Sequence, residues 1–302
     1  MKEKSFNEIN AIDNIPKNSK KILDFFTSEG LNKKDTELID TFLNDKKFDL
    51  KQYNKLAIKV SKKREKSVYA ETDFTDKLVT SLVMNYSEYN IAFYENLKKL
   101  LFDFYPENTT SIYINAMGRE GEYTYIRKDT RQKALKKYNI PIKAYLIYLV
   151  SNYNSSYEAM LKGHCVTSYR EYLVILKKEV KEHFLVLLEI MDIITIKAQI
   201  KLIDLLMEKE KEKTIDYILT NLINKATSKQ LTQKIIEILE NNLELKNEII
   251  KLLKSKKKPA REIAVELLIK WKLPENKKLL TPLVNDKSKN IVSMIADFLA
   301  TV

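Results

Sequence analysis

The sequence predicts an all-α protein in which paired helices stack into a solenoid, and three observations predict it. The chain has 302 residues, 44% of them hydrophobic, which is enough to bury a sizeable core. It contains only four Gly and six Pro, whereas sandwiches, barrels and dinucleotide-binding folds need many more glycines for turns and close approaches. An apolar segment also recurs four times in the C-terminal half at helix-pair spacing.

The recurring segment is seven residues long and occupies residues 200–206, 233–239, 262–268 and 293–299. Each copy ends in Leu and carries an acid at its fifth position, namely Asp204, Glu237, Glu266 and Asp297. Another amphipathic run separates successive copies, at 211–224, 243–254 and 275–284. Two antiparallel helices cannot bury their own apolar faces, so such units must stack. The alternative is coincidence among leucine-rich helices. Because an active site is singular, we interpret the repeated acids as contacts of each unit.

One copy resembles a known repeat family. Residues 259–268 look like the second helix of a HEAT unit, with Pro259 at the turn, Arg261 after it, and small and apolar residues facing inward. The resemblance covers residues 180–302, and the other units lack that proline. It implies degenerate HEAT-like helix pairs of the ARM/HEAT superfamily, wound into a right-handed superhelical α-α solenoid. Since HEAT arrays are mostly scaffolds, it also implies a non-enzymatic role in protein–protein interaction.

The expected domains are a helical region at 1–179, made of drifted repeats or a cap, and the repeats at 180–302. Within residues 106–128, the segments 111–114 and 122–126 alternate as strands do. A β-hairpin and a short helix capped at Gly118, followed by an irregular loop, are equally compatible with this region. Helices are expected in the first region at 19–29, 34–45, 49–63, 73–86, 88–104, 129–139, 141–151, 155–162 and 167–178.

Little in the sequence suggests catalysis, a cofactor or a metal, so we predict none of the three. Cys165 is the single cysteine and follows His164, but neighbouring side chains on a helix point about 100° apart. His183, with Glu182 and Glu179, could form half of a metal site, although no second ligand motif exists and a solvated helix face is favoured.

Certain bacterial enzymes, the alkyl-purine DNA glycosylases, also use HEAT-like repeats and have a basic concave face. Tryptophan is prominent near the lesion in those enzymes. The single tryptophan of this sequence, Trp271, lies at the end of an expected helix, close to Pro274, and we interpret it as a core residue. An enzyme of that type is therefore disfavoured.

Positive charge is the strongest functional signal. The formal net charge is +12, although only six of the 53 basic residues are Arg, the residue that base-specific readers use most. Because a positive net charge permits binding to nucleic acid, nucleic acid is the alternative to a protein partner. Aromatic and cationic side chains alternate at Tyr123, Tyr125, Arg127 and Arg131, a pattern that suits binding of single-stranded nucleic acid. We favour the alternative, in which the tyrosine rings pack in the protein core. The candidate anion-binding residues lie near the starts of the repeated helices: Lys197, Lys229, Lys256, Lys257, Lys258, Arg261, Lys287 and Lys289.

The sequence also bears on location and assembly. No stretch reaches about 20 uncharged apolar residues, and the first residues lack a signal-peptide core, so we expect a cytoplasmic protein without a transmembrane segment. Residues 291–302 are strongly apolar, with Asp297 the single charge. A solenoid needs a polar cap, so this helix is expected to dock onto another domain, another chain or missing repeats of a larger protein or assembly.

Overall fold

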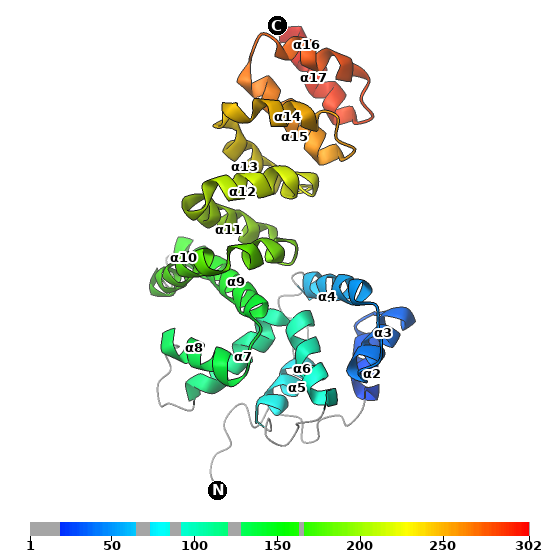
Figure 1. Cartoon of the computed structure of the whole chain (residues 1–302), viewed down its shortest axis with the longest axis vertical. Helices are drawn as coiled ribbons and strands as arrows, with labels where there is room; N and C mark the ends of the chain where they lie inside the picture. Colours follow the sequence, from blue (N-terminus) through cyan, green and yellow to red (C-terminus); the bar gives the residue numbers. More distant parts are fainter. Residues whose placement is uncertain (1–18, 65–72, 85–91, 120–127, 163–165, 302) are drawn as a thin grey trace. The chain divides into compact units, whose positions relative to one another are not determined.

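The computed structural model describes residues 19–64, 73–84, 92–119, 128–162 and 166–301, and the regular elements in these ranges are all helices (Figure 1). The all-α prediction is therefore confirmed for the described part of the chain. The chain divides into two compact units. The first comprises residues 1–179 and 185–195, and the second comprises residues 180–184 and 196–302.

The first unit contains nine described α-helices and one 3-10 turn. Most of them match the ranges expected from apolar periodicity. Residues 180–184 of its last helix, α10, are grouped with the second unit. The elements are α2 (Lys20–Ser28), α3 (Lys33–Leu43), α4 (Leu50–Arg64), α5 (Asp73–Met84), α6 (Ala92–Phe104), α7 (Pro106–Arg119), α8 (Lys128–Lys137), α9 (Ile142–Leu161), α10 (Val166–Glu189) and η1 (Ile190–Asp192).

Aromatic side chains fill the core of the first unit. Phe42 stacks on Tyr53 with ring centroids 4.5 Å apart, and Phe104 lies 5.8 Å from Tyr53 and 5.4 Å from Phe26. These rings come from α2, α3, α4 and α6. Helix α7 contacts α5, α6, α8 and α9 and is central to the rest of the unit. Edge and offset ring pairs of this kind add to the gain from apolar burial.

Of the two alternatives for residues 106–128, the helix is confirmed for residues 106–119, and the hairpin is wrong there. Residues 111–114 lie inside α7 and are helical, while residues 122–126 fall outside the described ranges. Pro106 and Glu107 occupy the first turn of α7, where a missing donor and a negative charge are both well tolerated. Tyr113 and Ile114, which lie on this helix, are both fully buried. Packing against four helices thus outweighs the local alternation.

Two helices expected at 141–151 and 155–162 form the single helix α9. Residues 152–154, which separate the two expected ranges, are Asn, Tyr and Asn and do not interrupt the helix. The side-chain amide of Asn152 donates to the carbonyl oxygen of Tyr148 at 2.8 Å, one turn back, and Tyr153 is buried. The polar residues therefore leave the backbone hydrogen bonds of the helix in place.

The second unit alternates longer and shorter helices, in the order expected from the repeat. The segments with the recurring acid form the longer helices, and the intervening runs form the shorter ones with 3-10 turns. The elements are α11 (Ile196–Lys209), α12 (Lys211–Thr220), η2 (Leu222–Asn224), α13 (Lys229–Glu240), η3 (Leu243–Leu245), α14 (Lys246–Leu252), α15 (Lys258–Trp271), α16 (Asn276–Leu280), η4 (Thr281–Asn285) and α17 (Lys289–Thr301).

The four longer helices of the second unit form a row. Helix α11 contacts α13, α13 contacts α15, and α15 contacts α17 (Figure 1). Helix α15 is the best buried of them, with Ala260, Ile263, Ala264, Val265, Leu267 and Leu268 at most 1% exposed. Pro259 stands in its first turn, as expected, and Lys272 ends it in a left-handed conformation with φ 49°. Among the described residues, no helix is both long and apolar enough to span a bilayer.

Candidate functional site

Polar contacts between successive long helices fix their relative direction. Asp204 of α11 pairs with Lys234 of α13, with 2.5 Å between Oδ1 and Nζ. At the ends of α13 and α15, Lys270 Nζ lies 2.9 Å from Glu240 Oε2, and Trp271 Nε1 donates to the Glu240 carbonyl at 2.9 Å. The starts of α15 and α17 are joined by an ion pair between Arg261 and Asp286. The starts of α15 and α17 therefore lie along one edge, and the ends of α13 and α15 lie together at the other.

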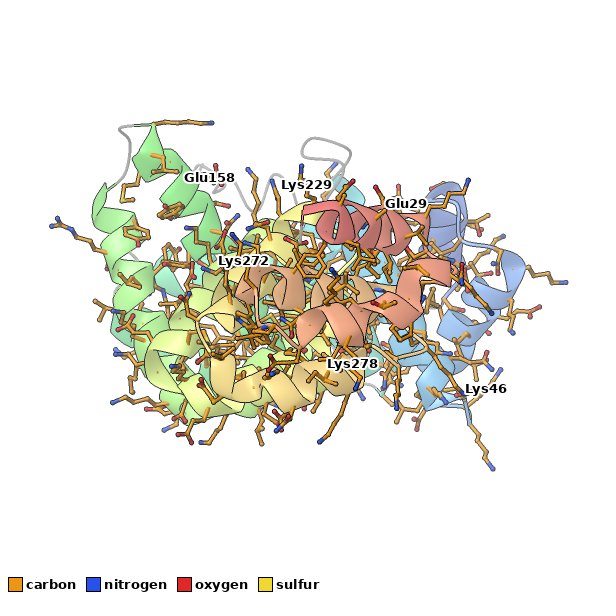
Figure 2. The ribbon with its side chains drawn as sticks, turned by 90° about the horizontal axis from the view of Figure 1, so that it is seen from above. Glu29, Lys46, Glu158, Lys229, Lys272 and Lys278 are labelled. Carbon is orange, nitrogen blue, oxygen red and sulfur yellow. The ribbon has the colours of Figure 1, made fainter. Side chains whose placement is uncertain are left out.

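This edge gathers most of the predicted anion-binding residues. We call it the basic edge and define it by the exposed lysines at or just before the helix starts, of which Lys229 is labelled in Figure 2. Helix N-termini carry partial positive charge and unsatisfied N–H groups, so added lysines make the edge attractive to anions. Its members are Lys197, Lys229, Lys256, Lys257, Lys258, Lys287 and Lys289.

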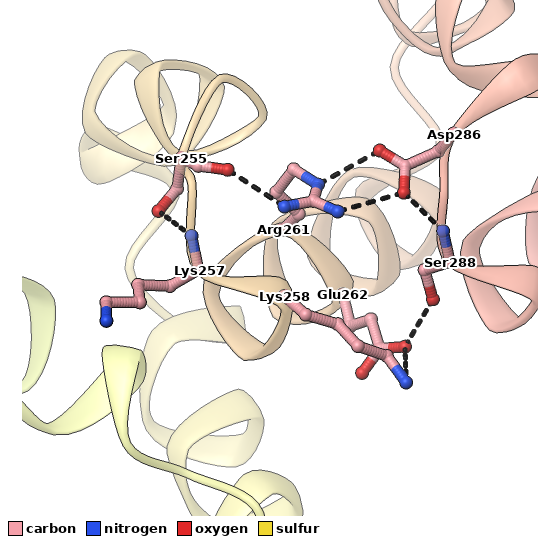
Figure 3. A network of polar contacts seen from close by, with 7 residues as sticks. All are labelled: Ser255, Lys257, Lys258, Arg261, Glu262, Asp286 and Ser288. Atoms are coloured by element: carbon pink, nitrogen blue, oxygen red, sulfur yellow. Dashed lines mark hydrogen bonds and ion pairs between the residues drawn. The ribbon is translucent and has the colours of Figure 1, made fainter.

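Arg261, the eighth predicted residue, has a different role. Its Nε and Nη2 atoms donate to both carboxylate oxygens of Asp286 at 2.9 and 3.0 Å, and its Nη1 donates to the Ser255 carbonyl at 2.9 Å (Figure 3). The side chains of the pair are only 14% and 9% exposed. The guanidinium hydrogen bonds hold the pKa of Asp286 below its ordinary value. Arg261 therefore joins α15 to the start of α17 and is not part of the basic edge.

The neighbouring lysines stay accessible. Lys258 pairs with Glu262 one turn later at 3.5 Å, but its side chain remains 62% exposed. Glu262 also accepts a hydrogen bond from the Ser288 hydroxyl at 2.8 Å. The side chain of Lys257 points away from this network (Figure 3). Lys256 and Lys257 are exposed, which leaves them available to an external anion.

Acids are absent from the connections before α13 and α15 and more common at the ends of α11 and α13. The connections before α13 and α15, residues 221–229 and 253–258, contain lysines and no acid. At the opposite ends, residues 208–213 alternate three Glu with three Lys, and residues 240–248 hold three Glu against one Lys. The other two starts each include an acid, Asp192 before α11 and Asp286 before α17, and residues 270–278 at the end of α15 hold four Lys against one Glu. The excess of lysine over acid is therefore concentrated at the starts of α13 and α15.

An open cavity of about 600 Å³ lies between the second halves of α15 and α17. Its apolar lining comprises Ile269, Leu273, Pro274, Met294 and Phe298. Two of the repeated acids, Glu266 and Asp297, also line it, together with Lys272 and Lys277. The sequence analysis did not single out this site, because its walls come from residues that periodicity alone assigns to an ordinary core face.

The residues considered for metal binding lie on α10. Potential ligand atoms of Glu179, Glu182 and His183 fall within 4.8 Å of one another, and the backbone at His183 departs from helical geometry with φ −132°. Glu179 is buried, whereas Glu182 is exposed. One helix supplies all three groups. The other reactive pair, His164 and Cys165, lies outside the described residues.

In the first unit, Arg131, which was considered with nearby tyrosines for binding of single-stranded nucleic acid, is buried. Arg131 is 3% exposed, and its guanidinium lies 5.1 Å from the ring of Tyr172. Its Nε and Nη1 atoms have no hydrogen-bond partner. Burial raises the pKa of Tyr145 and Tyr148, the two tyrosines electrostatically coupled to it. Arg131 is therefore a core residue. Tyr123, Tyr125 and Arg127 lie outside the described ranges.

The apolar face of the last helix is largely covered within the second unit. Ile291 and Ile295 are fully buried and Phe298 is 8% exposed, because α15 and η4 pack against α17. Val292, Met294 and Leu299 remain half-buried. The docking expected for this helix stays a prediction, and it now concerns those three residues.

Comparison with known proteins gives no further assignment. No protein-family model matches the chain, and no curated protein matches it.

Proposed function

We propose that residues 196–301 form a HEAT-like α-solenoid that acts as a non-enzymatic scaffold, and that its basic edge binds nucleic acid. The row of α11, α13, α15 and α17 supports the solenoid, because each long helix contacts the next through a polar link of its own. Degenerate HEAT-like units would explain why the recurring acid persists while the turn proline does not.

The observation that carries the binding role is the excess of lysine over acid at the starts of α13 and α15. Lysine at a helix start opposes the helix dipole at a local cost of a few tenths of a kcal/mol. In this row the cost recurs at the starts of α13, α15 and α17. Seven exposed lysines on one edge, facing few acids, provide the point charges that phosphates attract. Because lysine lacks the bidentate geometry of arginine, we expect binding without base specificity.

A titration at several salt concentrations tests this proposal. Fluorescence anisotropy with a labelled duplex and a labelled single strand should give an affinity that falls steeply as salt rises. Replacing Lys256, Lys257 and Lys258 by Ala removes three phosphate contacts. The slope of log K against log salt should then flatten by roughly two to three, at about 0.7 to 0.9 per contact.

A matched variant controls for net charge. Lys209→Ala, Lys211→Ala and Lys213→Ala together remove the same charge from the opposite ends of the helices, and this change should leave the slope close to that of the unmodified protein. Equal flattening in both triple variants would show that charge acts without regard to position and would refute the basic edge. Absence of binding at low salt would refute nucleic-acid binding altogether.

A protein partner is a second candidate function, and one observation favours it. The cavity between α15 and α17 is open and mainly apolar, although it lies in a unit whose core is otherwise well buried. Open apolar sites on folded proteins commonly receive a side chain or ligand from outside.

A further inference from the structure

The junction between α13 and α15 contains a contact that suggests what the cavity binds. Trp271 packs at the end of α13, where its indole Nε1 donates to the Glu240 carbonyl at 2.9 Å. The preceding residue, Lys270, forms an ion pair with the Glu240 carboxylate, and this pairing raises the pKa of Lys270. Glu237 and Glu266, two of the repeated acids, add to the negative potential around that ammonium group. A basic residue followed by an aromatic one thus joins two neighbouring helices.

The cavity occupies the corresponding place at the next junction. Aligning the repeated segments places Ile269 at the position of Glu240, and Ile269 lines the cavity. The same alignment places residues 301 and 302, Thr and Val, at the positions of Lys270 and Trp271. The aligned positions of the sequence therefore carry neither the cation nor the indole that join α15 to α13.

The chemistry of the cavity matches the missing pair. Ile269, Leu273, Pro274, Met294 and Phe298 offer an apolar surface for a ring. Two acids, Glu266 and Asp297, and two lysines, Lys272 and Lys277, line the cavity, and the acids can pair with an adjacent cation. A volume of about 600 Å³ lies within the range of small-molecule and side-chain pockets.

We propose that this cavity binds a partner polypeptide through an aromatic side chain, best a tryptophan, that directly follows a lysine or arginine. The ring lies against Ile269, Met294 and Phe298, and the cation pairs with Glu266 and Asp297. The partner in this way repeats, between molecules, the contact that Lys270 and Trp271 make within the chain. The site is separate from the basic edge, since the cavity lies toward the ends of α15 and α17 and the edge lies at their starts.

Titration of the whole protein with blocked dipeptides tests the proposal. The probe is N-acetyl-Lys-Trp-amide, followed by NMR of the methyl groups of Met294 and Ile269. We expect saturable shifts of both signals, with a dissociation constant in the millimolar range because so small a ligand buries little surface. N-acetyl-Lys-Ala-amide should give no saturable shift. N-acetyl-Glu-Trp-amide should bind at least fivefold more weakly.

Two variants separate the ring from the cation. Met294→Lys places a charge in the half-buried apolar lining and should abolish the Ile269 shift. Glu266→Gln with Asp297→Asn should weaken the Lys-Trp probe severalfold and remove its advantage over the Glu-Trp probe. Circular dichroism and the melting temperature establish that each variant is folded. A folded variant that fails these expectations counts against the proposal.

Three results would overturn it: no saturable shift with the Lys-Trp probe, shifts confined to residues away from the cavity, or tighter binding of the Glu-Trp probe. The last result would show that Lys272 and Lys277, and not the acids, pair with the charged residue of the ligand, and that the partner is acidic. Nucleic-acid affinity measured on the same variants reports separately on the basic edge. Met294→Lys leaves all seven lysines of the edge in place, so failure of one proposal does not imply failure of the other.

Discussion

Arg261 and Asp286 show how one residue pair can organise a helix junction. The guanidinium makes two hydrogen bonds to the carboxylate and a third to the Ser255 carbonyl, and Asp286 Oδ1 also accepts from the Ser288 backbone N–H at 2.7 Å. Bidentate pairs of this type add geometric specificity as well as energy. The pair therefore fixes both the turn before α15 and the entry into α17.

Replacing Asp286 by Asn should lower the free energy of unfolding by about 1 to 3 kcal/mol, because the amide cannot accept both guanidinium hydrogen bonds. The free energy of unfolding of the variant should also change less as the pH falls. In the folded protein the pKa of Asp286 is lower than its ordinary value of 3.8. The stabilisation is thus complete above that value and disappears as the pH falls through the folded pKa.

Urea unfolding at a series of pH values measures both effects. Asp216→Asn, a change of an exposed acid on α12, is the control and should alter stability by no more than about 0.5 kcal/mol. If Asp286→Asn proved as stable as the unmodified protein, the junction would not depend on this pair.

At the scale of single elements, helix ends follow the rules of local backbone chemistry. Helix α2 ends in a Schellman motif, in which Leu31 N–H bonds the Phe26 carbonyl and Gly30 N–H bonds the Thr27 carbonyl. Gly30 has φ 80°, a conformation that a Cβ atom disfavours. Because glycine permits it at no steric cost, the chain can turn directly from α2 toward α3.

Exchanging two glycines for alanine should therefore have different effects. Gly30→Ala should destabilise the protein by about 1 to 2 kcal/mol, because the left-handed backbone conformation is unfavourable for alanine. Gly118 is the second-last residue of α7, so Gly118→Ala should change the free energy of unfolding by no more than about 0.5 kcal/mol. Thermal unfolding followed by circular dichroism distinguishes the two. A loss above about 1 kcal/mol in Gly118→Ala would contradict a helical backbone at this position.

The elements also show what a sequence can and cannot foretell. The helix pairs of residues 196–301 were predictable because an apolar segment recurs, and the ends at Gly30 and Pro259 because their cap chemistry is local. The sequence left strand and helix open for residues 111–114, since burial of Tyr113 and Ile114 by other helices has no local signature.

The candidate sites were predictable only in part. The lysines of the basic edge could be found because they precede repeated helices. The partner of Arg261 could not, because Asp286 lies 25 positions away and nothing near either residue marks the pair. The cavity was likewise hidden, since Met294 and Phe298 look like core residues until α15 is placed beside them.

On the scale of the whole second unit, stability is distributed along a row. Each long helix is held chiefly by its neighbours, as in repeat arrays, where stability is close to a sum of local and nearest-neighbour contributions. Helix α15 has a long helix on both sides, α13 and α17. Among the described long helices, α17 packs chiefly on α15.

Native-state hydrogen exchange should reveal this gradient. The amides of α15 should exchange more slowly than those of α17, because opening the last helix breaks one junction and opening α15 breaks two. Asp286→Asn should speed exchange in α17 and leave α11 nearly unchanged. Equal rates in α15 and α17 would show instead that the unit opens in a single cooperative step.

A row joined in this way has a mechanical consequence. Small rotations at the junctions α11–α13, α13–α15 and α15–α17 add along the row, so a modest strain at each produces a large curvature overall. Under tension the row should lengthen by yielding one joint at a time, as a chain of hinges does, and the joint secured by Arg261 and Asp286 should resist longest. The second unit would then behave as an elastic element whose stiffness depends on the apolar packing and the polar pairs at each junction.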